Sequence, residues 1–175
     1  MKNLLLFSRT PGARFAEEDL GALLDRCALL VHHKAELQEV DVQVEVAPDV
    51  PRVECDASQI QQVILALTMN AIESMPNGGT VRLRLEPAED MDVAGVKLEV
   101  VDTGCGIPQE ALPHVFEPFF STKQEGEGVG LGLSVVYGIV ERHHGRVNVY
   151  SIAGEGTAFR VHLPRRQPQE PDEPE

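Results

Sequence analysis

The chain lacks tryptophan and has only two tyrosines and six phenylalanines, so any core must be largely aliphatic. Basic residues are also scarce, because 15 Lys and Arg stand against 28 Asp and Glu and leave a net charge of −13. Proteins that bind nucleic acid need Lys and Arg patches to neutralise the phosphate backbone. The composition therefore argues against nucleic acid as a partner. It permits a single nucleotide, whose phosphates can be met by Mg²⁺ and backbone amides.

Cysteines are few and far apart. Cys27, Cys55 and Cys105 form no C-x-x-C pair, and an odd number argues against a disulfide framework. This pattern favours a reducing, cytoplasmic compartment. No apolar run approaches the length of a membrane span, and Met1-Lys2 does not open a signal peptide. We expect a cytoplasmic segment without membrane contact of its own, while a membrane anchor in a longer parent protein stays open.

Three parts are predicted along the 175 residues. Residues 17–164 carry regular hydrophobic patterns and form one domain. Residues 1–16 contain a short apolar run that a Thr-Pro-Gly breaker at 10–12 ends, which fits either the end of a longer helix or a tail. Residues 165–175 are rich in Pro and Glu and predict a disordered acidic tail.

Hydrophobic periodicity predicts three main helices and five strands. Helices are expected at 17–37, at 56–75 and from about 130 to 144, with a short one at 109–115. Strands are expected at 41–46, 81–85, 96–100, 146–151 and 157–163, with an acidic loop at 87–95. This order predicts an α/β (α+β) two-layer sandwich. Its mixed, mostly antiparallel five-stranded sheet would be covered on one face by three helices.

One stripe of the helix at 56–75 carries Ala66, Asn70 and Glu73 on the shoulder of its apolar face. An asparagine among apolar neighbours is unfavourable unless its amide is hydrogen-bonded. Asn70 therefore either bonds to the backbone or supplies an oxygen ligand to Mg²⁺, a cation that prefers oxygen and keeps several waters. The residue type alone favours the bond to the backbone.

Two glycine-rich segments follow the helix. In the first, residues 102–108 (DTGCGIP), Asp102 either caps a turn or accepts a hydrogen bond from an exocyclic amine. The second, residues 126–133 (GEGVGLGL), leads into a helix whose first amides form an anion site. Glycine-rich segments of this kind are typical of mobile lids. Ser121, Thr122 and Lys123 add two hydroxyls and an ammonium beside it, which suit phosphate.

The order of these segments resembles the ATP-binding catalytic domain of sensor histidine kinases, in the superfamily shared with gyrase, the Hsp90 chaperones and MutL. The resemblance covers residues 18–164. The matching segments are the N box at 68–75, the first glycine box at 102–108, the F box at 116–123, the second glycine box at 128–133 and the final glycine–threonine turn at 154–157. The F box, FEPFFSTK, is most similar to the nitrogen-regulation type.

The resemblance implies the Bergerat ATP-binding fold, with ATP and Mg²⁺ as cofactors. Asn70 would be the catalytic residue that holds Mg²⁺, and Asp102 would bond the adenine amino group. The base pocket would be shaped by Gly104, Gly106 and Ile107 and supported by Thr157. The phosphates would be contacted by Lys123, Gly128, Val129, Gly130, Leu131, Gly132 and Leu133.

The implied activity is transfer of the γ-phosphoryl group of ATP to a histidine on a dimerisation domain. The family's phosphoacceptor motif, the H box, is a His followed by Glu or Asp and then a Pro on a dimerisation helix. None of the six histidines fits it, and His143 is expected to be structural. Residues 1–16 are therefore interpreted as the remnant of a dimerisation helix and linker, with the phosphoacceptor domain upstream. The implied partners are that domain and a response regulator, and the parent protein would be a homodimer.

Two other functions remain as alternatives: an ATPase of the gyrase and chaperone type, and a non-catalytic nucleotide-binding regulatory module. Ala66 stands where many sensor kinases carry a second Asn and where the gyrase and chaperone branches carry a water-activating Glu. Alanine cannot activate water, so Ala66 favours phosphoryl transfer over hydrolysis. Neither an altered N box nor lost glycines, which would favour the regulatory module, is present.

Overall fold

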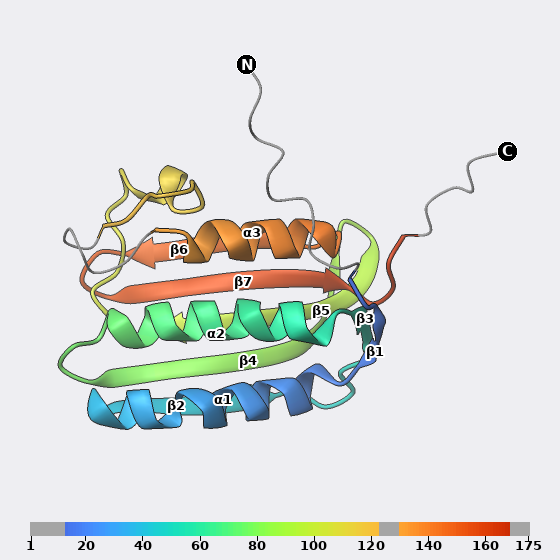
Figure 1. Cartoon of the computed structure of the whole chain (residues 1–175), viewed down its shortest axis with the longest axis horizontal. Coiled ribbons are helices and arrows are strands. Elements are labelled where there is room, and N and C mark those ends of the chain that lie inside the picture. The colour runs from blue at the N-terminus through green and yellow to red at the C-terminus, as the bar shows by residue number, and fades with distance from the viewer. Residues whose placement is uncertain (1–12, 123–129, 169–175) are drawn as a thin grey trace, which may run out of the picture.

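Three helices cover one face of a five-stranded sheet in the computed structural model, which describes residues 13–122 and 130–168 (Figure 1). The helices are α1 (Leu20–Leu37), α2 (Ala57–Glu73) and α3 (Gly132–Arg142). The spatial order of the strands is β2 (Val40–Val46), β4 (Gly79–Asp90), β5 (Val93–Asp102), β7 (Gly156–Pro164) and β6 (Arg146–Ile152). Among these five described strands, the β2–β4 pair is parallel and the other three pairs are antiparallel. The predicted two-layer sandwich with a mixed sheet is confirmed.

The core lies between the helices and the sheet, and it is aliphatic as the composition requires. The central helix α2 buries Ile60, Val63, Ile64 and Leu67 completely. Alternate residues of β4 and β5 face it: Val81, Leu83, Leu85, Val96, Leu98 and Val100. Burial of each large aliphatic side chain contributes about 1.5–3 kcal/mol. None of the helices in the described residues has the length and apolar character of a membrane span.

The start of α2 follows the sequence prediction. Asp56 is the N-cap, and its Oδ1 accepts hydrogen bonds from the backbone N of Ser58 at 3.0 Å and of Gln59 at 3.2 Å. The predicted start of α1 was wrong, because residues 16–18 form strand β1 (Ala16–Glu18) rather than a first helical turn. This strand pairs with β3 (Val53–Cys55) in a second, two-stranded sheet. Strands of three residues are too short to show an alternating hydrophobic pattern, so the sequence did not predict them.

Two further predicted segments need correction. The acidic segment 87–95 is not a loop, because β4 and β5 pair through it and reverse only at Met91 and Asp92, whose φ angles are 49° and 65°. Backbone pairing continues there although Glu89 and Asp90 interrupt the apolar alternation. The predicted helix at 109–115 is reduced to the single 3₁₀ turn η1 (Leu112–His114), which is too short for an α-helical hydrogen-bond pattern.

Residues on both sides of the predicted range 17–164 make hydrogen bonds to the segment before α2. The backbone N of Arg14 donates to the Asp56 carboxylate at 3.0 Å. At the other end, the carbonyl of Arg165 accepts from the backbone N of Glu54 at 2.9 Å, and the backbone N of Gln167 donates to the Glu54 carboxylate at 3.0 Å. The apolar run before the Thr-Pro-Gly breaker and residues 169–175 lie outside the described residues.

His143 joins the end of α3 to the start of α2 and is completely buried. Its Nδ1 lies 2.8 Å from the carbonyl of Ile139, and the backbone N of Asp56 donates to its Nε2 at 3.1 Å. A carbonyl only accepts, so Nδ1 carries the proton and the ring is neutral. Burial lowers the pKa of His143 below its ordinary 6.5. The structural role expected for this histidine agrees with these contacts.

This histidine should make the domain less stable in mild acid. Because its folded pKa is lowered, the stabilisation is complete above 6.5 and is lost as the pH falls through that value and then through the lowered pKa. Urea unfolding between about pH 7.5 and 5.5 should therefore show a falling free energy of unfolding. His143→Gln retains an acceptor without titrating and should flatten this slope. An equally steep slope in the variant would contradict the assignment.

Candidate functional site

The helix α2 ends and α3 begins at the same end of the layers (Figure 1). A cavity of about 460 Å³ lies between residues of these two helix ends and the two glycine boxes. It brings together nine of the predicted site residues: Asn70, Asp102, Gly106, Ile107, Gly130, Leu131, Gly132, Leu133 and Thr157. Gly104 lies behind Asp102, whose side chain it contacts. Lys123, Gly128 and Val129 lie outside the described residues. The cavity therefore unites the central helix with both glycine boxes.

The carboxylate of Asp102 is fixed through one of its two oxygens. Its Oδ1 accepts from the backbone N of Gly104 at 2.8 Å and of Thr157 at 3.3 Å, and it lies 3.3 Å from the Ser74 hydroxyl. Asp102 is only 6% exposed. None of the hydrogen bonds between described residues reaches Oδ2. One oxygen thus orients the group, and the other remains for a ligand.

The electrostatics of Asp102 suit a ligand that donates a hydrogen bond. Burial raises the pKa of its carboxyl above the ordinary 3.8, while the bonds from Gly104, Thr157 and Ser74 act in the opposite direction. A carboxylate in a largely buried position gains from any hydrogen-bond donor that reaches its remaining oxygen. Because an ionised carboxylate only accepts, it selects donors such as an exocyclic amine.

The first glycine box needs its glycines for close backbone packing. A Cβ at Gly104 would lie 2.0 Å from the Ser74 Oγ. Gly106 has a φ of +70°, and a Cβ there would lie 2.2 Å from the carbonyl oxygen of Ile152. Side chains at these positions would push the loop away from α2 and from the β6–β7 hairpin. The glycines therefore hold the Asp102 loop in place.

Asn70 contributes an uncommitted amide to the cavity. Its neighbours Thr68 and Ser74 bond to backbone carbonyls of α2, at 2.7 Å and 2.8 Å, but no hydrogen bond between described residues uses the Asn70 side chain. The side-chain-to-backbone alternative is thus not seen in this part of the chain. Glu73 also lines the cavity. Both side chains contain an oxygen atom of the kind that coordinates Mg²⁺.

This donor set fits Mg²⁺ only together with a ligand. Within the described ranges, no group of three or more His, Cys, Asp or Glu is placed to hold a metal ion. Mg²⁺ is usually held by one or two protein oxygens, with waters and substrate phosphates in its remaining positions. Asn70 and Glu73 can supply those protein oxygens, so the residues present fit a phosphate-bound Mg²⁺.

The beginning of α3 forms the side of the cavity that suits an anion. α3 starts at Gly132 rather than near 130, and Leu131 at its N-cap makes no side-chain capping bond. The first amides of the helix are therefore available to a ligand. The backbone N of Phe119 donates to the carbonyl of Gly130 at 2.9 Å, which ties the F box to this helix start.

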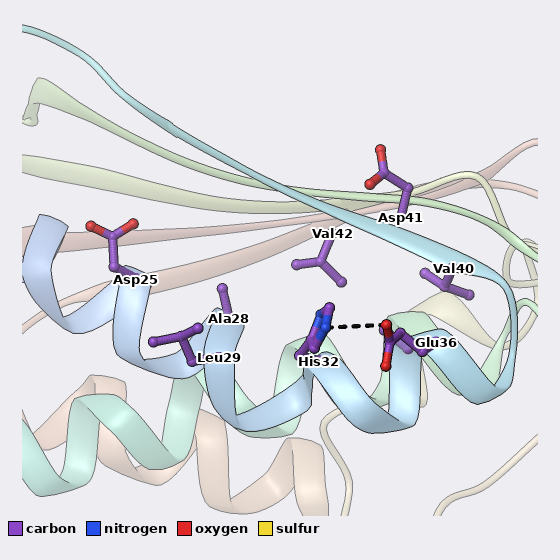
Figure 2. Close-up of a pocket in the computed structure, with 9 residues that line it drawn as sticks. Asp25, Ala28, Leu29, His32, Glu36, Val40, Asp41 and Val42 are labelled. Atoms are coloured by element: carbon purple, nitrogen blue, oxygen red, sulfur yellow. Dashed lines mark ion pairs between the residues drawn. The ribbon is translucent and has the colours of Figure 1, made fainter.

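A second hollow, of about 530 Å³, lies between α1 and the edge strand β2 (Figure 2). Its polar groups include His32 and Glu36 on α1, whose Nε2 and Oε1 atoms are 3.3 Å apart and exposed. It contains none of the predicted site residues. Ligand sites are marked by a few converging, oriented polar groups rather than by volume. We therefore place the functional site around Asp102.

Sequence reasoning missed two hydroxyls of the site. Ser74 lies beside Asp102, and the Ser151 Oγ accepts from the backbone N of Ile107 at 2.8 Å. Serine at a helix end or in an outer strand is common, so neither position carries a signal of its own. Only the contact across the fold identifies them.

Residues 55–167, which include every described residue of the cavity, match the family of histidine kinase-, DNA gyrase B- and HSP90-like ATPases. The chain belongs to this ATPase family. Sensor kinase CckA of Brucella abortus is 36% identical over 94% of this chain and 18% of its own length. Sensor histidine kinase ZraS of Escherichia coli K12 is 36% identical over 86% of this chain and 32% of its own. The chain thus spans about a fifth to a third of these relatives.

Solved structures agree over almost the whole domain. The catalytic domain of histidine kinase ThkA superposes with a TM-score of 0.74 at 32% identity, covering 87% of this chain and 97% of that one. Full-length ShkA in complex with AMPPNP gives a TM-score of 0.81 at 27% identity, covering 94% of this chain and 34% of that one. This member of the ATPase family is a histidine kinase-type catalytic domain.

Proposed function

We propose that this domain binds ATP with Mg²⁺ and transfers the γ-phosphoryl group to a histidine of a dimerisation domain outside this chain. The observation that carries the proposal is the buried carboxylate of Asp102, which is oriented through Oδ1 and retains Oδ2 for a ligand donor. The ShkA structure, a complex with AMPPNP, supports a nucleotide as that ligand.

The adenine end of the ligand would lie at the first glycine box. The adenine amino group would donate to Asp102, with Ile107 and Thr157 beside it in the cavity lining. Gly104 and Gly106 would keep the loop close enough to α2 and β6 for this contact. Selection of an amino group by a buried acceptor discriminates strongly, because an unpaired partner is unfavourable.

The phosphate end would lie at α3. The amides of Gly130 to Leu133 would meet the phosphates, together with the predicted contacts from Lys123, Gly128 and Val129. Asn70, with Glu73 nearby, would hold the metal ion. When bound, Mg²⁺ neutralises charge that develops on the phosphates. Positioning by α2 and α3 is then the main contribution of the protein.

Transfer to histidine requires no base from this domain. The imidazole nitrogen attacks the γ-phosphorus, the bond to the β–γ bridging oxygen breaks, and ADP leaves while the ring loses its N–H proton to solvent. Hydrolysis would instead need a residue that activates water. Ala66, one helical turn before Asn70 on α2, has no group that can do so.

The remaining partners follow from the same activity. ThkA has been solved in complex with the response regulator protein TrrA, a structure whose TM-score to this chain is 0.73 at 29% identity. For the parent of this chain we propose that the phosphohistidine passes its phosphoryl group to a response regulator. We also propose a homodimeric parent, with this domain in the cytoplasm, where ATP is available.

The proposal is tested by supplying the acceptor separately. Mixing this chain, Mg²⁺, ATP and a purified dimerisation domain of the parent protein should yield acid-labile phosphate on the added domain and none on this chain. Phosphate release from ATP by this chain alone should remain low. Stable acid-labile phosphate on the chain by itself, or hydrolysis without transfer, would contradict the proposal.

A further inference from the structure

Ser151, near the end of β6, connects three parts of the site through one hydroxyl. Its Oγ lies 2.8 Å from the backbone N of Ile107 in the first glycine box. The same atom lies 2.8 Å from the carbonyl oxygen of Gly156 and 2.9 Å from the Thr157 Oγ1, both on β7. Ile107 and Thr157 line the cavity. The hydroxyl thus bridges the loop and the strand that meet at Asp102.

The hydrogen atoms of this network can be assigned from the partners. The Gly156 carbonyl can only accept, so Ser151 uses its single O–H there. The Ile107 N–H donates to one Ser151 lone pair. The Thr157 hydroxyl must then donate to the other, because Ser151 has no second proton. Both lone pairs and the proton of Ser151 are used.

The consequence concerns Thr157. With its proton directed to Ser151, the Thr157 hydroxyl presents only lone pairs to its other neighbours. Its backbone N meanwhile donates to Asp102 Oδ1 at 3.3 Å and helps to orient that carboxylate. The base end of the cavity therefore offers acceptors from both Asp102 and Thr157. Such a surface suits a purine with an amino group at position 6 and disfavours one with an oxo group.

We infer that Ser151 is a positioning and specificity-determining residue, which turns the Thr157 hydroxyl into an acceptor and thereby selects adenine over 6-oxopurines. This inference rests on the proposed ATP binding. Ser151 acts through Thr157 and the Ile107 loop.

Removal of the hydroxyl should leave the fold intact. The backbone N of Gly154 donates to the carbonyl of Cys105 at 2.7 Å, so a second bond still joins the β6–β7 hairpin to the first glycine box. Ser151→Ala should therefore alter nucleotide recognition more than stability. In this variant the Thr157 hydroxyl is free to rotate and to donate. It could then donate a hydrogen bond to the 6-oxo group of a purine.

The experiment measures the affinities for ATP and for inosine triphosphate, which carries the 6-oxo group, by calorimetry. The wild type should prefer ATP. Ser151→Ala should weaken ATP binding about tenfold, the net value of about one hydrogen bond, while inosine triphosphate binding changes little. Ser151→Thr, which restores a hydroxyl, should recover the preference. Thr157→Val should reduce the preference for ATP as much as Ser151→Ala does. The double variant should show no larger loss of preference than either single variant.

Ser58→Ala is the matched control, because Ser58 also loses a hydroxyl bond, at 2.6 Å to Asp56, but does not line the cavity. It should leave the ATP preference unchanged. If the wild type binds no nucleotide, the proposed function fails. If it binds ATP but Ser151→Ala and Thr157→Val keep the wild-type preference, only the inference about Ser151 is overturned.

Discussion

Asp102→Asn is expected to lower the affinity for ATP about 100-fold, or about 2.7 kcal/mol, while the domain stays folded. The asparagine oxygen can take over the hydrogen bonds from Gly104 and Thr157 to Oδ1. Its NH₂ group then occupies the place of Oδ2. Two donors, this NH₂ and the adenine amino group, would face each other, and neither would be satisfied.

The same substitution should not destabilise the domain in the absence of nucleotide. Folding raises the pKa of Asp102, so its contribution to stability is fullest below the ordinary 3.8 and is lost as the pH rises through the raised pKa. At neutral pH the buried charge is therefore unfavourable, and the neutral amide removes it. The Tm of Asp102→Asn without nucleotide should equal or exceed that of the wild type.

Calorimetry with two nucleotides checks the assignment. Asp102→Asn should narrow or invert the preference for ATP over inosine triphosphate, because an NH₂ group can donate to a 6-oxo group. Thermal unfolding of the same samples shows whether the variant is folded. Unchanged ATP affinity in a folded variant would remove Asp102 from the adenine contact and leave the proposed function without its main support.

Asn70→Ala is expected to abolish the part of ATP binding that depends on Mg²⁺ and to reduce phosphoryl transfer by about 100-fold or more. Asn70 lines the cavity with an amide that no described residue engages. Loss of this oxygen ligand leaves the metal with fewer protein contacts. The measurement is the ATP affinity with and without Mg²⁺, followed by transfer to the separate dimerisation domain.

Two further variants make the result specific. Asn70→Asp retains an oxygen at this position and should keep part of the Mg²⁺ dependence. Gln62→Ala removes an exposed amide from the same helix, outside the cavity, and should behave like the wild type. A Mg²⁺ effect of wild-type size in Asn70→Ala would show that another group holds the metal. Asp102→Asn should weaken ATP binding with or without Mg²⁺, which separates the two ends of the site.

The fold was predictable where one segment carries its own pattern. The helical spacing of Ile60, Val63, Ile64 and Leu67 predicts α2, because a helix that packs on a sheet must bury one apolar stripe. The capping role of Asp56 was also readable, since a cap and the amides that it bonds are two and three residues apart. The β1–β3 pair was not, because three-residue strands have no period and depend on a partner 35 or more positions away.

The sequence named candidate residues that line the cavity, but it could not give their arrangement. For Asn70, the residue alone favoured a bond to the backbone over a ligand role, and the described structure shows no such backbone bond. For Asp102, a turn cap and a ligand acceptor proved compatible, because Oδ1 holds the Gly104 amide while Oδ2 remains. The sequence did not indicate Ser74 or Ser151 as site residues, because serine is common at helix ends and in outer strands.

The order of the N box, the two glycine boxes and the final glycine–threonine turn determined the family and the fold by itself. Each of these signals is local, so a linear sequence can carry it. The tertiary structure alone decided which carboxylate oxygen is used and which way the Thr157 hydroxyl donates. These depend on contacts between residues 55 positions apart for Asp102 and Thr157, and 44 apart for Ile107 and Ser151. Hydrogen-bond direction is a property of atoms brought together in space, and no spacing along the chain encodes it.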